Sequence, residues 1–237
     1  MRSGCAWQRA DLTRSGDELT GSTVHGWLID LDAPADLDAL LSASERDRAA
    51  SYLRPRDGAR FAMSRAWLRI ILGRYLETQA ADLSFARAPD GRPVLAGRRN
   101  GWLHFSLSRA GGRALVALSR APVGADIERV EARAGLADLV AGRFSGAEAA
   151  CLADGCGGTP THGFYRHWTV KEAYLKATGH GLSGLRDTEL ICAARPAVRF
   201  AGQAAPDWQV TLFAPAADCV AAIVGRGPVT RGGPASV

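Results

Sequence analysis

The order of helical and alternating hydrophobic patterns limits the fold of this chain more than any other feature. One long helical pattern begins at about residue 57, where Phe61, Leu68 and Ile71 recur at helical spacing, and a second contains HWTVKEAYLKATGHGL, from His167 to Leu182. Because both halves of the chain also contain strands, an α+β protein of two subdomains is predicted. The segments that indicate strands are DLSFARA, WLHFSLS, ALVALS and VGADIERV before the second helix, and DTELICAA, AVRFAG, WQVTLFA and CVAAIVG after it.

The two ends of the chain lack these patterns. Residues 1–22 are polar and rich in Gly and Ser, and GRGPVTRGGPASV at the other end has the same character. We therefore expect flexible tails at 1–22 and 227–237. Between them, an N-terminal α+β subdomain is expected at 23–122 and a C-terminal one at 123–226.

The composition is typical of a globular protein with anionic partners. The 237 residues are 47% hydrophobic, which is enough to bury one large core or two modest ones. The formal charge of +5 comes mostly from scattered arginines, which favours phosphates or acidic protein surfaces as partners. Nucleic acid is not expected as a partner, because the sequence has no basic block with interleaved aromatic residues.

Cysteine usage and the lack of a long apolar run bear on the compartment. The five cysteines are odd in number and widely spread, with no C-x-x-C pair and no histidine at zinc-finger spacing. Reduced thiols in a cytoplasmic setting are therefore expected. The N-terminal segment carries Arg and Asp where a signal peptide needs an apolar core, and no segment approaches about 18 apolar residues, so neither export nor a membrane span is predicted.

The segment GADIERV places two carboxylates on one face of a predicted strand. Side chains alternate along a strand, so Asp126 and Glu128 point the same way while Ile127 points to the core. Carboxylates about 7 Å apart repel each other unless a cation or a basic side chain lies between them. Taken alone, the segment is explained by a charged strand edge that Arg129 or another arginine neutralises.

The helix that contains Glu172 also has an ordinary explanation when taken alone. Glu172 and Lys176 are four residues apart, in the order that forms a favourable pair on a helix surface. Thr169 and Glu172 also fit a T-x-x-E capping box, in which Glu172 only ties off a helix start. Trp168 is expected in the core in either case.

Together, the two segments indicate a metal-dependent site. A D-x-E strand and a K-E helix about 45 residues further on supply three carboxylates for a hard divalent cation such as Mg²⁺, which prefers oxygen ligands. A lysine beside such a cation can meet a phosphate. The pair GADIE (124–128) and WTVKEAYLK (168–176) resembles the two signatures of the 4′-phosphopantetheinyl transferase superfamily, G-x-D-x-E and W-x-x-K-E-[AS]-x-x-K.

The resemblance extends over most of the chain, from Val24 to about Gly225, and is to the surfactin-synthetase-activating type of the family. DGRPVL is similar to a family turn, LHFSLSRAGGRALVALS to a family hairpin, and SERDRAASYL with DGARFAMSRAWLR to a basic helical region that meets coenzyme A. The family fold is α+β, with two similar subdomains related by a pseudo-twofold axis in one monomeric chain. The active site lies in the cleft between them.

The resemblance implies a reaction and its partners. The family moves 4′-phosphopantetheine from coenzyme A to a serine of an acyl or peptidyl carrier protein and releases adenosine 3′,5′-bisphosphate. Mg²⁺ is the implied metal, with Mn²⁺ as an alternative. The implied partners are therefore coenzyme A and a carrier protein, with no membrane and no nucleic acid.

The resemblance also implies roles for particular residues. Asp126, Glu128 and Glu172 are expected to hold the metal, and Glu172 and Lys176 to be catalytic. Arg109 stands where the family has histidine, and a homologue that binds coenzyme A without turnover is the alternative function. Arginine keeps the positive charge that a phosphate contact needs. The residues expected to contact coenzyme A are Arg48, Arg60, Arg92, Ser108, Arg109, Asp126 and Lys176.

Overall fold

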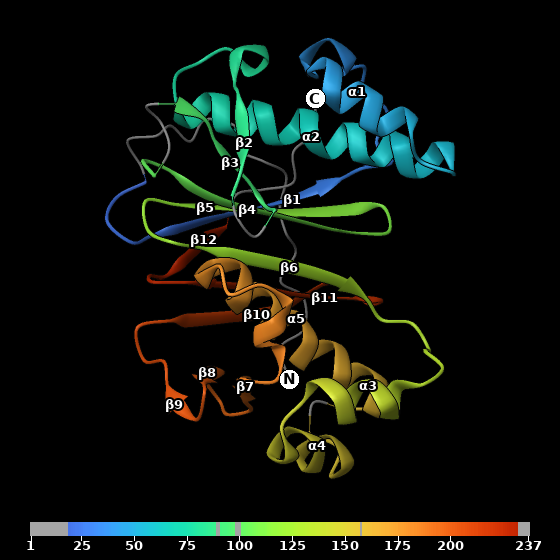
Figure 1. The fold of residues 1–237 in the computed structure, drawn as a ribbon, viewed down its shortest axis with the longest axis vertical. Coiled ribbons are helices and arrows are strands. Elements are labelled where there is room, and N and C mark those ends of the chain that lie inside the picture. Colours follow the sequence, from blue (N-terminus) through green and yellow to red (C-terminus); the bar gives the residue numbers. More distant parts are fainter. Residues whose placement is uncertain (1–18, 89–90, 98–100, 157, 232–237) are drawn as a thin grey trace.

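Two stacked sheets, each covered by helices on its outer side, build the protein (Figure 1). The computed structural model describes residues 19–88, 91–97, 101–156 and 158–231. One sheet has the strand order β12-β1-β5-β4 and lies under α1 and α2, and the other has the order β10-β11-β6 and lies over α5. Two small sheets, β2-β3 and β7-β8-β9, flank these layers. The predicted α+β class is confirmed.

Helix-rich and strand-rich runs follow one another along the described chain, as the sequence predicts. The helices are α1 (Ala43–Ala50), α2 (Pro55–Tyr75), α3 (Leu136–Arg143), α4 (Gly146–Ala153) and α5 (Pro160–Thr178). The strands are β1 (Val24–Asp30), β2 (Phe85–Arg87), β3 (Pro93–Leu95), β4 (His104–Ala110), β5 (Arg113–Ser119), β6 (Gly124–Arg129), β7 (Thr188–Ile191), β8 (Ala197–Phe200), β9 (Gln203–Ala204), β10 (Gln209–Ala216), β11 (Cys219–Gly225) and β12 (Val229–Arg231).

Each long helix buries its apolar face against one sheet. Leu68, Ile71 and Leu72 of α2 pack on Trp27 and Ile29 of β1. On the other side of the molecule, the apolar face of α5 packs on β11. Burial of such side chains contributes about 1.5–3 kcal/mol each, so these contacts fix the position of both helices.

The two sheets pack face to face through a second set of apolar side chains. Leu115 and Ala117 of β5 meet Ala125 and Ile127 of β6 in one buried cluster. Because β5 has apolar residues on both faces, its sequence ALVALS is a continuous run and does not alternate. The neighbours of Ala125 and Ile127 in β6 therefore face α5.

The edges of the two sheets meet where β4 and β6 run side by side. The Ser106 hydroxyl of β4 accepts a hydrogen bond from the backbone nitrogen of Ala125 at 3.0 Å and lies 3.4 Å from the Ala125 carbonyl oxygen. This seam joins the two sheets at the level of the D-x-E segment.

Two details differ from the sequence predictions. The tail predicted from residue 227 is wrong for Val229–Arg231, which forms β12 and pairs in parallel with β1; residues 232–237 and 1–18 lie outside the described part of the chain. A three-residue strand has too short a pattern to be recognised. The long helix α5 begins at Pro160, seven residues before the pattern quoted from His167. None of the described helices is long and apolar enough to cross a membrane.

The cysteines also differ from expectation. Cys151 and Cys156 are joined by a disulfide, so the prediction of reduced thiols is wrong for this pair in the form described. The chain turns between them after α4 and brings their Cα atoms to 5.3 Å, which is within the range for disulfides. Cys192 and Cys219 are free, and Cys5 lies outside the described residues.

Candidate active site

Strand β6 and helix α5 pack closely because Gly124 has no side chain. A Cβ atom at this position would meet the carbonyl oxygen of Ala173 and would lie 2.6 Å from the backbone nitrogen of Ala177. Backbone atoms cannot move aside as a flexible side chain does, so only glycine permits this approach. The first residue of the G-x-D-x-E segment thus places the carboxylate face of β6 against α5.

Asp126 lies at the centre of the site and is 3% exposed. Its Oδ1 accepts a hydrogen bond from Lys176 Nζ at 2.6 Å and another from Ser108 Oγ at 2.7 Å. Its Oδ2 is buried and has no hydrogen-bond partner among the residues that the structure describes. Leaving a buried carboxylate oxygen unpaired is unfavourable by about 1–3 kcal/mol, so this oxygen is well suited to bind a ligand.

Ionisation of the two glutamates in the site is disfavoured. Burial, together with the charge of Asp126, raises the pKa of Glu128 to about 7, against the opposing effects of Lys176 and a hydrogen bond with Trp168. Burial also raises the pKa of Glu172, with Lys176 opposing and Asp126 adding to the rise. Burial works against the charge of Lys176, but Asp126 and the glutamates raise the pKa of this lysine overall. Three carboxylates thus share one ammonium group.

Two of the ordinary explanations, neutralisation by Arg129 and the T-x-x-E capping box, are wrong, whereas Glu172 and Lys176 do attract each other. Arg129 does not neutralise the D-x-E face, because its Nε pairs with Asp218 Oδ2 at 3.2 Å. Thr169 does not cap a helix, because it lies inside α5 and donates its hydroxyl to the carbonyl oxygen of Tyr165 at 2.6 Å. Lys176 forms its ion pair across to β6, with Asp126.

Trp168 contributes more than packing, which the sequence analysis missed. Its ring is partly buried and stacks on Phe164, with ring centroids 5.7 Å apart. Its hydrogen bond with Glu128 stabilises the charged form of that carboxylate. The indole N–H is a donor only, so a tryptophan that lies four residues before Glu172 on α5 is suited to hold a carboxylate oxygen.

Besides Asp126 and Lys176, two of the predicted coenzyme A residues lie in or against this site. Ser108 of β4 belongs to it through the hydrogen bond to Asp126. Arg92, which precedes β3, donates from Nη1 to the carbonyl oxygen of Lys176 at 3.0 Å. This bond ties the β2–β3 hairpin to the C-terminal part of α5.

Arg109 extends away from Asp126, toward the start of α2. Its guanidinium donates to the hydroxyl of Tyr52 at 3.3 Å and lies over the ring of Phe61, 5.2 Å from the centroid. Arg48 lies over the ring of Tyr52, 5.4 Å from the centroid. The aromatic pair Tyr52 and Phe61, which the sequence analysis did not single out, thus holds both arginines.

A pocket of about 780 Å³ lies beside these arginines, between α1, α2 and β2. Phe61, whose ring lies under the Arg109 guanidinium, forms part of the pocket wall. Pro93 also lines the pocket, and Arg92 is next to it in sequence. The sequence analysis identified only one arginine of the pocket, and the others became visible only through the packing of α2 on β2. The basic residues that line it are Arg48, Arg65, Arg69 and Arg87.

Arg60 is not brought to this group. It binds Asp32 through two hydrogen bonds, of 2.8 Å from Nε and 2.6 Å from Nη2, and holds the pKa of that carboxyl well below its ordinary value. The pair lines a different pocket, of about 520 Å³, with Arg113 and Arg129.

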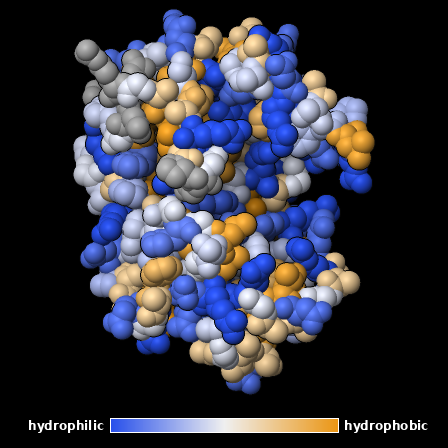
Figure 2. All heavy atoms as spheres, in the orientation of Figure 1, coloured by the Kyte–Doolittle hydropathy of each residue, from blue (hydrophilic) through white to orange (hydrophobic). Residues whose placement is uncertain are grey.

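In the space-filling view, hydrophilic residues border a notch at the right-hand edge, between the upper and lower layers (Figure 2).

The donor set fits a hard divalent cation. Asp126 has an unpaired buried oxygen, and Glu128 and Glu172 face it with ionisation disfavoured by burial and mutual repulsion. A cation that binds between the three carboxylates removes that repulsion. All three offer oxygen ligands, which suits Mg²⁺ or Mn²⁺ and does not suit a soft metal.

Comparison with known proteins gives consistent matches. A family model described as the 4′-phosphopantetheinyl transferase superfamily matches residues 122–224. The chain is 35% identical to the 4′-phosphopantetheinyl transferase HetI of Nostoc sp. (strain PCC 7120 / SAG 25.82 / UTEX 2576), over 88% of this chain and 90% of that relative. It is 30% identical to a phosphopantetheinyl transferase of Thraustochytrium sp., over 67% of this chain and 59% of the relative. It is 24% identical to the 4′-phosphopantetheinyl transferase Sfp of Bacillus subtilis, over 61% and 63%.

Proposed function

Because the chain belongs to the 4′-phosphopantetheinyl transferase superfamily, we propose that the seam between β4, β6 and α5 is its transfer site. In this reaction, a serine hydroxyl of an acyl or peptidyl carrier protein attacks the β-phosphate of coenzyme A. Phosphopantetheine becomes bonded to the serine oxygen, and adenosine 3′,5′-bisphosphate leaves with the electrons of the broken P–O bond. The observation that carries the proposal is the buried Asp126, bonded to Lys176 and Ser108 and with one oxygen unpaired.

The metal that suits the site is Mg²⁺ or Mn²⁺, held by Asp126, Glu128 and Glu172. When bound, such an ion neutralises charge on phosphate oxygens and orients the diphosphate. The raised pKa of Glu128 supports this assignment, because a carboxylate that resists ionisation gains most from a neighbouring cation.

Glu172 is the proposed base for the serine proton. Burial raises its pKa, so its carboxylate binds a proton more readily than an exposed glutamate does near neutral pH. Its place on α5, which is anchored to β6 at Gly124, holds the carboxylate in a fixed position relative to Asp126. The proton therefore passes from the serine oxygen to the Glu172 carboxylate as the new P–O bond forms.

Lys176 and Ser108 are proposed to bind the diphosphate. The ammonium of Lys176 lies 3.3 Å from Ser108 Oγ, so a phosphate oxygen can reach both groups at once. Lys176 is already held in place by Asp126, which limits the reorganisation needed when the phosphate arrives. Its charge then stabilises the negative charge that develops on the leaving group.

The pocket between α1, α2 and β2 is proposed to take the nucleotide end of coenzyme A. Arg48 lines this pocket, Arg109 lies over the ring of Phe61 in its wall, and Arg92 directly precedes Pro93, which also lines it. Arginine binds phosphate through two parallel hydrogen bonds, which suits the ribose phosphate and the diphosphate. Arg60 is assigned to the same substrate only if its pairing with Asp32 opens, so its contribution is expected to be the smallest of the set.

The decisive experiment measures the intact mass of an apo carrier protein after incubation with this protein, coenzyme A and Mg²⁺. Transfer adds about 340 Da, the mass of one phosphopantetheine group. The gain is expected to disappear with EDTA, to return when Mg²⁺ or Mn²⁺ is added in excess, and to disappear in the Glu172→Gln variant. Full transfer by Glu172→Gln would remove Glu172 from the mechanism, and full transfer in EDTA would remove the metal. We further propose that the protein acts as a cytoplasmic monomer, which gel filtration and cell fractionation can test.

A further inference from the structure

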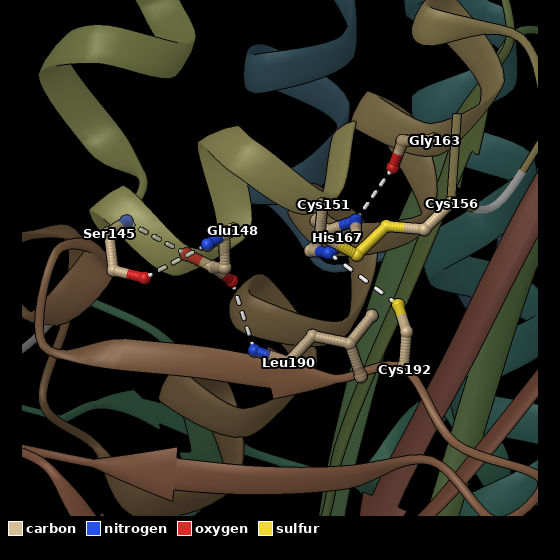
Figure 3. Close-up of a disulfide and its surroundings, with 8 residues drawn as sticks. All are labelled: Ser145, Glu148, Cys151, Cys156, Gly163, His167, Leu190 and Cys192. Carbon is tan, nitrogen blue, oxygen red and sulfur yellow. Dashed lines mark hydrogen bonds between the residues drawn. A yellow bond between two sulfur atoms is a disulfide. The ribbon is translucent and has the colours of Figure 1, made fainter. Parts of the chain in front are cut away.

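Three cysteines and a histidine gather beside the N-terminal half of α5, and none of them belongs to the carboxylate site. Cys151 belongs to α4, Cys156 to the loop that follows it, His167 to α5, and Cys192 directly follows β7 (Figure 3). The sulfur atoms and a ring nitrogen of this group all lie within 4.8 Å of one another. Cys151 and Cys156 are close in sequence, but His167 and Cys192 come from later elements, so the fold brings the four residues together.

The orientation of His167 is the first sign that the group is built to bind something. Its Nδ1 lies 2.9 Å from the carbonyl oxygen of Gly163. A carbonyl oxygen only accepts hydrogen bonds, so in the neutral ring Nδ1 carries the hydrogen and the lone pair lies on Nε2, where it accepts a hydrogen bond from the Cys192 thiol. Nε2 lies 3.6 Å from Cys192 Sγ, on the side of the cysteines (Figure 3). In a metal-bound histidine, a hydrogen bond from the ring nitrogen that does not bind the metal fixes the tautomer, as the bond to Gly163 does here.

The distances also match a known coordination. In a tetrahedral zinc site with Zn–S of about 2.3 Å and Zn–N of about 2.0–2.1 Å, two sulfurs lie about 3.8 Å apart and a sulfur and a nitrogen about 3.6 Å apart. The Nε2–Sγ distance of 3.6 Å has this value, and the outer limit of 4.8 Å exceeds the sulfur separation by about 1 Å. The sulfurs of Cys151 and Cys156 are bonded to each other in this form, so they must also separate to about 3.8 Å after reduction for the four ligands to surround one ion.

We propose that Cys151, Cys156, His167 and Cys192 bind one Zn²⁺ ion as a structural site. Thiolates and imidazole are the ligands that zinc prefers, and four protein ligands leave no open position for a substrate. The site is separate from the carboxylate site, which offers oxygen ligands to a hard cation. It is therefore independent of the transfer reaction.

The disulfide and the zinc site are two forms of the same cluster. A dithiol reductant supplies two electrons and two protons, so that the Cys151–Cys156 disulfide becomes two thiols while the reductant becomes a disulfide. Binding of Zn²⁺ to the neutral His167 and to three thiolates then releases three thiol protons. Cys192 is exposed, which gives the ion a path to the cluster.

The proposed ion joins elements that a buried ion pair already links. Glu148 of α4 accepts hydrogen bonds from Lys171 Nζ of α5 at 2.6 Å and from the backbone nitrogen of Leu190 in β7 at 2.9 Å. Zinc would add a second link between the same three elements; Figure 3 draws Glu148 and the cysteine cluster in one view. Both links lie on the helix that carries Glu172, so the ion is expected to stabilise α5 on its sheet.

Metal content tests the proposal directly. The full chain is purified in a phosphine reductant, which keeps thiols reduced without acting as a thiol ligand, and its zinc is measured by plasma mass spectrometry. About one zinc per chain is expected. After zinc removal, Co²⁺ is added, and tetrahedral thiolate ligation is expected to give intense visible bands and a thiolate-to-cobalt charge-transfer band.

Two variants separate this site from other cysteines. Cys192→Ser removes one ligand without touching the Cys151–Cys156 pair, and it is expected to lose most of the zinc and the charge-transfer band. Cys219→Ala is the matched control, because Cys219 lies in β11 outside the cluster, and it is expected to keep both. Circular dichroism checks that each variant is folded. The cobalt spectrum of the unaltered protein serves as the second measurement if Cys192→Ser fails to fold.

The opposite results would overturn the proposal. Zinc near zero in the unaltered reduced protein, with no cobalt bands, would leave the disulfide as the only role of Cys151 and Cys156. Equal zinc in Cys192→Ser and Cys219→Ala would place the ion elsewhere. If the proposal is correct, zinc removal is expected to lower the melting temperature of the unaltered protein and not that of Cys192→Ser.

Discussion

The Glu128→Gln variant offers the sharpest test of the electrostatics of the active site. The pKa of Glu128 is raised from its ordinary value of 4.5 to about 7, by burial first and then by Asp126 and Glu172 against Lys176 and Trp168. At about 1.36 kcal/mol per pH unit, this difference corresponds to on the order of 3 kcal/mol, which partial exposure reduces to about 2 kcal/mol.

The sign of the effect follows from proton binding. Below pH 4.5, Glu128 is protonated in both the folded and the unfolded chain and makes no difference. Between 4.5 and about 7, the folded state keeps a proton that the unfolded state has lost, so the free energy of unfolding decreases as the pH rises. Above about 7, the whole penalty of a buried, repelled carboxylate is present. At pH 8, the metal-free protein is therefore less stable than it would be if Glu128 were neutral.

The assay is urea unfolding in EDTA at pH 5 and pH 8, followed by circular dichroism. Glu128→Gln removes the charge and keeps the shape, so it is expected to be more stable than the unaltered protein by about 2 kcal/mol at pH 8 and to differ much less at pH 5. Mg²⁺ is expected to stabilise the unaltered protein at pH 8 and to act weakly on the variant. Glu131→Gln, which changes an exposed glutamate three residues away, is the matched control and should show neither effect. Identical pH dependence in Glu128→Gln and the unaltered protein would refute the reasoning.

Three further substitutions test the rest of the site. Gly124→Ala is expected to destabilise the protein by about 1–3 kcal/mol in urea unfolding, because its Cβ meets the backbone of α5; unchanged stability would show that β6 and α5 can separate freely. Lys176→Met is expected to lower the rate of phosphopantetheine transfer about 100-fold or more and to leave Asp126 buried without a counter-ion, and near-normal transfer would exclude Lys176 from diphosphate binding. Arg109→Ala is expected to raise the KM for coenzyme A about tenfold with little change in kcat; a lower kcat at unchanged KM would place Arg109 at the reacting phosphate, and Arg109→His should restore the binding.

The sequence by itself determined the class of the fold and the two segments that pack together at the proposed site. Helical and alternating patterns are local, because each depends on side chains a few residues apart that must share one face. The α+β class and the long helices could therefore be predicted, as could the common face of Asp126 and Glu128. The segments G-x-D-x-E and K-E-A-x-x-K carried the resemblance to the family, which the comparisons confirm.

Only the tertiary structure decided which groups pair. Arg129 and Lys176 are both reasonable cations for Asp126 in the sequence, and the close packing permitted by Gly124 brings Lys176 and leaves Arg129 to Asp218. Arg60 is likewise paired with Asp32, which lies 28 residues before it, and so is not brought to the other arginines proposed to bind the substrate.

The cysteine cluster likewise could not be predicted from local sequence patterns. The spacing of Cys151, Cys156, His167 and Cys192 matches no short metal motif, and their closeness arises only when α4, α5 and β7 pack around Glu148. Contacts of this kind depend on how complete helices and sheets pack, because packing sets the distance between segments that are far apart in sequence. No local sequence pattern encodes that distance.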